Sequence, residues 1–231
     1  MKMENVKENT MKILWLSHLI PYPPKSGVLM RSYNLIREVA RYHEVDLLAF
    51  NQKNSLISYF ESIQAGKAKS REMLSQFISE ISYFDIQSDS SSMAKYWLAI
   101  KSLFTNEPYT INWLKSDDYS LAVADGVKRK HYDVIHFDTI SLAPFWDKHL
   151  KTPCVLDHHN VESHMMLRRV DHEKNPLKRW YFQQEGRRLE QYERKNMSAF
   201  DYHIVCSKDD GLRLLSLDKN LNTMVIPNGI S

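Results

Sequence analysis

Imidazole, amide and carboxylate side chains directly follow a short apolar segment of the chain. Residues 153–162 read Pro-Cys-Val-Leu-Asp-His-His-Asn-Val-Glu. Such a segment is typical of a buried parallel strand, and its polar end would emerge where open α/β sheets bind ligands. Because an imidazole titrates near neutrality and both donates and accepts hydrogen bonds, His159 is our candidate for acting on a hydroxyl group. The alternative is a structural histidine whose hydrogen bonds are satisfied.

The neighbours of His159 supply further polar groups for ligand binding. His158 and His159 point to opposite sides of a strand, so only one of them would face a crevice. Asn160 and Glu162 add an amide and a carboxylate to the candidate substrate site. A metal ion is the rival ligand, and the suitable side chains are Asp157, His158, His159 and His164. Their spacing matches no His-Glu-x-x-His motif and no cysteine pair lies near, so we predict no metal and no other cofactor.

Seven short segments are predicted to be strands, and they alternate with helical segments. The predicted strands are residues 11–18, 44–50, 81–86, 133–138, 153–160, 202–207 and a last one that begins at residue 223. The predicted helices are residues 29–42, 93–104, 118–130, 141–149, 161–200 with a break near 175, and 208–217. Residues 51–80 are mostly polar, with weak helical periodicity. This alternation predicts an α/β fold with a doubly wound, mostly parallel, seven-stranded Rossmann-like sheet.

In a parallel sheet the carboxyl ends of all strands lie at one edge. Asp138 ends the fourth predicted strand, so we expect it near His159. Gly27 precedes the first predicted helix, whose backbone N–H groups could face a phosphate; alternatively it merely ends a loop. Arg31 lies one turn further on and could add a cation there; alternatively it is a solvated surface charge.

Length and composition favour one large globular domain. The chain has 231 residues, of which 43% are hydrophobic and 26% charged, with a net charge of +3. We expect a single domain over residues 11–231, behind a disordered tail at residues 1–10 that lacks the apolar core of a secretory signal. No segment is apolar enough to span a membrane. Cys154 and Cys206 fall in predicted strands, which indicates buried, reduced thiols in a cytoplasmic protein.

Cations and aromatic residues are mixed along residues 178–195. A basic amphipathic helix could rest on the inner face of an anionic membrane, whereas a long surface helix explains the same pattern without a membrane. Interspersed glutamates and the small net charge argue against a nucleic-acid partner. The sequence contains neither Gly-x-Gly-x-x-Gly after its first strand nor a Gly-Lys-Ser/Thr loop, which disfavours ordinary dinucleotide and P-loop sites.

Taken together, five segments resemble the N-terminal domain of family-4 glycosyltransferases of the GT-B fold. These segments are Pro-Lys-Ser-Gly at 24–27, His-Glu-Val at 43–45, Asp-Val-Ile-His at 133–136, Val-Leu-Asp-His-His-Asn at 155–160 and Val-Ile-Pro-Asn-Gly-Ile at 225–230. The first has Ser26 where the family pattern has a glycine. The fourth matches the strand whose terminal histidine, here His159, lies beside the transferred sugar. The last resembles the hinge that precedes the second domain.

The resemblance implies the acceptor-side half of a retaining glycosyltransferase that uses a nucleotide-sugar donor and a glycan or lipid-linked acceptor. It also implies a C-terminal donor-binding domain that this chain lacks, so we expect little or no activity from the chain alone. Two other functions stay open: a stand-alone binding module, and a fragment of a GT-B sugar-nucleotide epimerase. A downstream sequence containing Glu-x7-Glu would favour the transferase.

Overall fold

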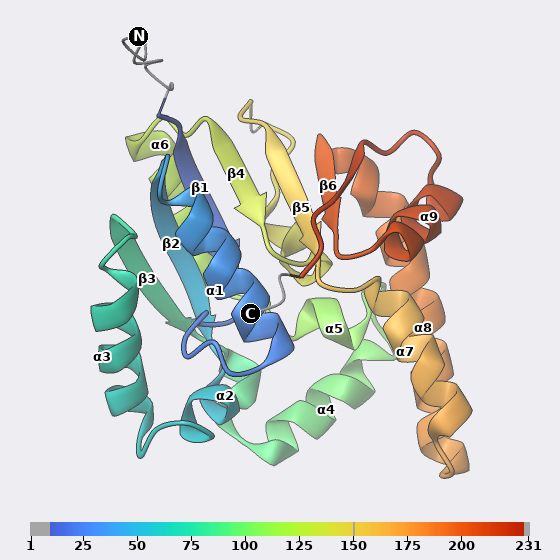
Figure 1. The fold of residues 1–231 in the computed structure, drawn as a ribbon. Helices are drawn as coiled ribbons and strands as arrows, with labels where there is room; N and C mark the ends of the chain where they lie inside the picture. The colour runs from blue at the N-terminus through green and yellow to red at the C-terminus, as the bar shows by residue number, and fades with distance from the viewer. Residues whose placement is uncertain (1–9, 150, 229–231) are drawn as a thin grey trace, which may run out of the picture.

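The computed structural model describes residues 10–149 and 151–228 (Figure 1). In these residues one seven-stranded sheet has the order β3-β2-β1-β4-β5-β6-β7, and all neighbouring strands are parallel. The strands are β1 (Lys12–Ser17), β2 (Glu44–Asn51), β3 (Glu80–Asp85), β4 (Val134–Phe137), β5 (Cys154–His158), β6 (Tyr202–Val205) and β7 (Thr223–Val225). The predicted α/β fold, with seven parallel strands, is confirmed. Most of the tail expected at 1–10 and the end of the hinge segment, residues 229–230, lie outside the described residues.

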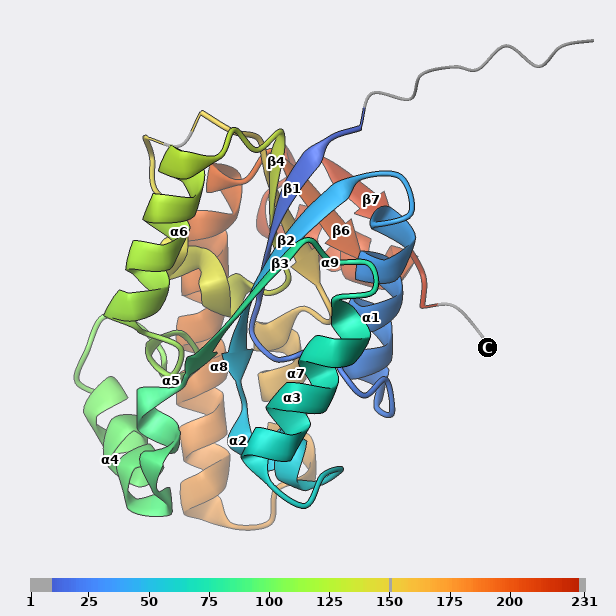
Figure 2. The same cartoon turned by 90° about the vertical axis from the view of Figure 1, so that its left-hand side faces the viewer.

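Helices cover both faces of the sheet (Figure 2). They are α1 (Gly27–Val39), α2 (Lys53–Ile57), α3 (Ile63–Leu74), α4 (Ser92–Ser102), α5 (Tyr109–Asn112), α6 (Asp117–Arg129), α7 (Glu162–His172), α8 (Pro176–Asn196) and α9 (Lys208–Leu217). Three 3₁₀ segments in the described residues are η1 (Gln87–Ser90), η2 (Ile140–Phe145) and η3 (Met197–Ala199). Helices α1 and α3 lie on one side of the sheet, and α4, α5 and α6 on the other (Figure 2). None of the helices in the described ranges is long and apolar enough to cross a membrane.

Two hydrophobic clusters fill the space between the helices and the sheet. One packs Ile36 of α1, Leu56 of α2 and Leu74 of α3 against strands β1 and β2. The other packs Tyr119 of α6 and Met197 of η3 against the opposite face. The central strands are therefore buried on both sides, as their continuous apolar sequences predict.

Polar residues set where several helices begin. Side-chain oxygens accept hydrogen bonds from backbone N–H groups in the first turn, which satisfies donors that the helix leaves unpaired. The residues that do so for α3, α4, α6, α8 and α9 are Ser62, Ser91, Ser116, Asn175 and Ser207. The serine-rich stretch 88–92 thus contains the N-cap of α4, Ser91.

The polar stretch 51–80, which shows only weak helical periodicity in sequence, holds two helices, α2 and α3. Two local predictions need correction. The short helix predicted at 141–149 is the 3₁₀ segment η2, which contains Pro144; proline lacks the N–H that an α-helix interior requires. Both cysteines are free thiols, but only Cys154 is buried in a strand; Cys206 lies just after β6 and is half-buried.

Candidate functional site

The site lies at the switch point of the sheet, between β1 and β4, where the strand order reverses. Strands β2 and β3 extend the sheet on one side of β1, and β4 to β7 extend it on the other. Open α/β sheets bind ligands at the carboxyl edge beside such a switch point. Here that edge is formed by the residues that follow β1 and β4, which are His18 and Asp138.

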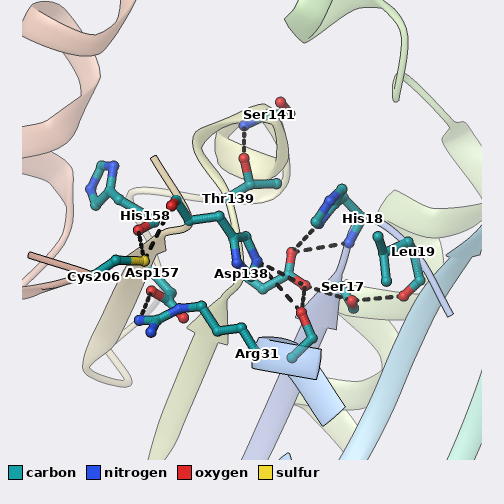
Figure 3. Close-up of polar contacts among 12 residues, drawn as sticks. Ser17, His18, Leu19, Arg31, Asp138, Thr139, Ser141, Asp157, His158 and Cys206 are labelled. Carbon is teal, nitrogen blue, oxygen red and sulfur yellow. Dashed lines mark hydrogen bonds and ion pairs between the residues drawn. The ribbon is translucent and has the colours of Figure 1, made fainter. Parts of the chain in front are cut away.

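A buried carboxylate organises this edge (Figure 3). Asp138 is fully buried and accepts hydrogen bonds from the Ser17 hydroxyl (2.6 Å) and the His18 backbone N–H (3.1 Å). Its Oδ1 also lies 2.7 Å from Nδ1 of the His18 ring. Because a carboxylate only accepts, the Nδ1 hydrogen points at Asp138, and Nε2 is the ring atom left to exchange a proton with a ligand.

His18 and Asp138 each stabilise the charged form of the other. Burial lowers the pKa of His18, but the charge and hydrogen bond of Asp138 outweigh it, and the net shift is upward. Burial raises the pKa of Asp138, but His18 and His159 outweigh it and hold the pKa well below its usual range. His18 is thus an oriented imidazole whose side chain is 16% exposed to solvent.

His159 completes the group from the end of β5. Its Nε2 lies 4.0 Å from Oδ2 of Asp138 and 3.5 Å from the Ser32 hydroxyl of α1. Its Nδ1 is buried and has no hydrogen-bond partner in the described part of the chain. The rings of His18 and His159 are 5.5 Å apart. The structure therefore brings His159 and Asp138 together, as their positions at strand ends predict.

His158 lies outside this group. Its ring points away from Asp138 (Figure 3) and its Nε2 is 3.1 Å from Nδ1 of His203 in the core. Burial, together with His203 and His159, holds the pKa of His158 well below its usual range. The two neighbouring histidines thus face opposite ways, and in this structure a ligand has no access to His158, which we had expected to bind substrate.

Asn160 and Glu162 differ in their availability. Asn160 is exposed at the carboxyl edge. Glu162 starts α7, and its carboxylate accepts hydrogen bonds from Thr139 and from Ser141 (3.2 Å). Glu162 therefore fastens α7 to the segment after β4.

Arg31 is neither a solvated charge nor a free cation, which corrects both sequence interpretations. It is buried, and one guanidinium N–H donates to Asp157 at 2.8 Å. Another donates to the Ile226 carbonyl (2.8 Å) and to the Asn228 side chain (3.0 Å). Arg31 therefore joins α1 to the end of β5 and to the segment after β7.

The first residue of α1, Gly27, has open space beside it. A Cβ added to Gly27 would meet nothing within 4 Å. Ser26, which stands where the family pattern has glycine, has φ −130° and ψ 161°, an extended conformation open to any residue. The serine therefore imposes no strain, and the role of Gly27 beside a phosphate stays a prediction.

The side chains considered from sequence as metal ligands do not form one site in the structure. Asp157 is hydrogen bonded to Arg31, and His158 is hydrogen bonded to His203. A different trio, His18, Asp138 and His159, has ligand atoms within 4.8 Å of one another. The 2.7 Å contact between His18 and Asp138 is a hydrogen-bond distance, so an ion between them would have to displace that bond. The expectation of a metal-free site stays a prediction.

Sequence reasoning missed the importance of His18, Ser17 and Ser32. His18 follows a buried apolar strand just as His159 does, so the sequence predicts its place at the carboxyl edge but not its bond to Asp138. The two serines carry no such signal, because their contacts with Asp138 cross more than a hundred residues of sequence.

Two solved structures share this architecture. One is the N-terminal domain of trehalose-6-phosphate phosphatase from Candida albicans, with 11% identity, a TM-score of 0.50, and coverage of 100% of this chain and 51% of that chain. The other is UGT89C1 from Arabidopsis thaliana in complex with UDP, with 12% identity, a TM-score of 0.50, and coverage of 96% and 53%. This chain has the fold of the N-terminal half of a GT-B protein. It spans about half the length of the solved structures it matches. No protein-family model and no curated protein matches the sequence.

A second buried carboxyl group holds the start of α7 next to Glu162. Glu193 of α8 accepts hydrogen bonds from the backbone N–H (3.1 Å) and the hydroxyl of Ser163. Burial raises the pKa of Glu193 from 4.5 to about 7, although Ser163 opposes the shift. The folded state therefore retains a proton that the unfolded chain has lost between these two pH values.

We expect the free energy of unfolding to fall by up to about 3 kcal/mol as pH rises from about 4.5 to 7 because of this group. Glu193→Gln keeps an acceptor for the Ser163 N–H and does not titrate, so it should flatten this pH dependence. Urea unfolding at several pH values measures it, with Glu61→Gln, which changes an exposed glutamate before α3, as the control. A Glu193→Gln variant with the wild-type pH profile would contradict the assignment.

Proposed function

We propose that this chain forms the acceptor-side half of a glycosyltransferase that takes a sugar from a nucleotide-sugar donor. The acceptor is a glycan or a lipid-linked glycan. The observation that supports the proposal best is the convergence of His18, Asp138 and His159 at the switch point of a GT-B N-terminal fold. The complex of UGT89C1 with UDP supports a nucleotide-containing donor for this fold.

Each residue of the site has its own role in the transfer reaction. The acceptor lies along the carboxyl edge, where Nε2 of His18 takes the proton from its hydroxyl group while Asp138 stabilises the imidazolium that forms. The acceptor oxygen then bonds to the anomeric carbon, and the bond from that carbon to the phosphate oxygen of the departing nucleoside diphosphate breaks. His159 contacts the transferred sugar, and the space at Gly27 allows a diphosphate to approach the backbone. A second GT-B half would stabilise the leaving diphosphate.

Two stereochemical courses follow from different observations. The resemblance to family-4 enzymes favours retention of the anomeric configuration. The oriented His18–Asp138 pair favours inversion, because a base on the acceptor side suits a single direct displacement. Proton NMR of the first-formed product distinguishes them, since it reports whether the new bond has the donor's anomeric configuration.

The chain alone is expected to show little or no transfer or hydrolysis with common nucleotide sugars. The physical reason is that the groups that bind the donor diphosphate belong to the second GT-B half. Release of nucleotide from a panel of donors, measured with and without that half, checks this. Robust turnover by residues 1–231 alone would refute the requirement for a second half.

In the complete transferase, His159→Ala is expected to lower kcat/KM by about tenfold to a hundredfold, because the sugar loses a hydrogen-bonding partner. Steady-state kinetics with varied donor measures the effect. His131→Ala, which removes an exposed histidine before β4, is the matched control and should leave the kinetics unchanged. Unchanged turnover by His159→Ala, with folded His158→Ala inactive, would mean that the other imidazole acts.

A further inference from the structure

Helix α4 presents an apolar face to solvent. The exposed fractions are 69% for Met93, 73% for Tyr96, 66% for Trp97, 51% for Ile100 and 86% for Phe104. Their spacing of three and four residues places the first four on one face of the helix, and Phe104 follows two residues after its end. Scattered exposed apolar residues are ordinary, but five on one short segment indicate an interaction surface.

The opposite side of α4 is fixed to the protein, so the direction of this face is set by the fold. Ser102 is buried and accepts a hydrogen bond from the Asn112 side chain of α5 at 3.1 Å. Lys95 pairs with Asp89 of η1 at 2.9 Å. Arg188 of α8 donates to the Thr105 carbonyl just after the helix, and to the Glu107 carbonyl.

A second patch of exposed apolar side chains lies at the tip of the α7–α8 hairpin. We call residues 168–181 the hairpin tip. There Leu177 is 77% exposed and Trp180 is 51% exposed. Figures 1 and 2 both place the hairpin tip and α4 at the same lower end of the molecule, the end toward which the strands of the sheet point.

Positive charge is concentrated at this end. Residues 92–106 contain two lysines and no carboxylate, and the hairpin tip contains five cations and two carboxylates. Together with Asp89, which pairs with Lys95, these segments carry seven cations against three carboxylates, a net charge of +4, whereas the whole chain carries only +3. Aromatic and aliphatic side chains bordered by Lys and Arg match the interface of an anionic bilayer.

We propose that α4 and the hairpin tip dock on an anionic lipid surface. The apolar face of α4 enters the headgroup region, and the cations of the hairpin tip contact lipid phosphates. A second copy of the chain fits this surface less well, because two faces of net charge +4 repel each other. Docking turns the carboxyl edge, with His18 and His159, toward the bilayer. That orientation suits a lipid-linked acceptor, a point that rests on the proposed function, whereas the docking itself does not.

Vesicle flotation of the purified chain tests the proposal. Binding is expected to vesicles of phosphatidylcholine with roughly a third phosphatidylglycerol, and to weaken in about 0.5 M salt or with phosphatidylcholine alone. The triple variant Tyr96→Ser/Trp97→Ser/Ile100→Ser should bind about tenfold more weakly or worse. Leu121→Ser, which removes a 62% exposed leucine from α6, is the matched control and should bind like the wild type.

Circular dichroism verifies that each variant is folded. Absence of wild-type binding, or equal binding by the folded triple variant, overturns the proposal. A dimer in analytical ultracentrifugation that the triple variant abolishes, without vesicle binding, overturns it in favour of self-association. Flotation needs no turnover, so it can fail while sugar transfer is confirmed, and it can succeed while sugar transfer is refuted.

Discussion

His18→Ala is expected to lower kcat/KM of the complete transferase by about a hundredfold to ten-thousandfold, the usual contribution of a positioned general base. The reason is the 2.7 Å contact that orients the His18 ring on Asp138. Asp138→Asn should also slow the reaction, since an amide cannot stabilise the imidazolium. Initial-rate kinetics over a range of pH measures both effects.

The pH profile separates proton transfer from mere positioning. His18 must be unprotonated to act as a base, and its pKa is raised above 6.5 mainly by Asp138 acting against burial. The rate should therefore fall below a pH somewhat above 6.5, and Asp138→Asn should move that limb to lower pH. A loss of less than about tenfold in His18→Ala, with an unchanged acid limb, would rule out the base.

Arg31→Met is expected to destabilise the fold by about 3–5 kcal/mol, because it leaves a buried carboxylate without its partner. The Arg31 and Asp157 side chains are only 2% and 1% exposed, and they are 2.8 Å apart. The variant also loses the contacts with the Ile226 carbonyl and Asn228, so the segment after β7 loses an attachment. Urea unfolding monitored by circular dichroism gives the free energy.

Two companion variants make that result specific. Arg31→Met/Asp157→Leu removes both charges and should recover most of the lost stability, since a buried apolar pair needs no desolvation of ions. Arg37→Met changes a half-exposed arginine of the same helix and should stay within about 0.5 kcal/mol of wild type. If Arg31→Met lowers the free energy of unfolding by less than about 1 kcal/mol, the Arg31–Asp157 pair does not stabilise the fold as its burial indicates.

The sheet could be predicted because its strands have local signatures. The apolar runs at β1, β2, β4 and β5 are buried on both faces, and the alternation with helices predicts a parallel arrangement. The opposite directions of His158 and His159 follow from the two-residue period of a strand. The helices α2 and α3 were not predicted because their sequence is mostly polar; tertiary packing stabilises both, and a serine N-cap stabilises α3.

The pairings in the site could not be predicted, because they depend on strand order. His18 meets Asp138 because β4, which β2 and β3 separate from β1 in the sequence, lies beside β1 in the sheet. Neither interpretation of Arg31, as a cation for a ligand or as a solvated charge, included its actual partners, Asp157 and Ile226, because these are 126 and 195 residues away. Sequence reasoning thus located the edge that carries the site, and the three-dimensional arrangement assigned its partners.

A crystal structure of the complete transferase with an unreactive nucleotide-sugar analogue tests the central claim most directly. We predict that the sugar ring lies at the carboxyl edge, hydrogen bonded to His159, with its anomeric carbon facing Nε2 of His18 across the space for an acceptor. A sugar bound elsewhere on the molecule, with His18 and His159 making no contact with donor or acceptor, would contradict the assignment.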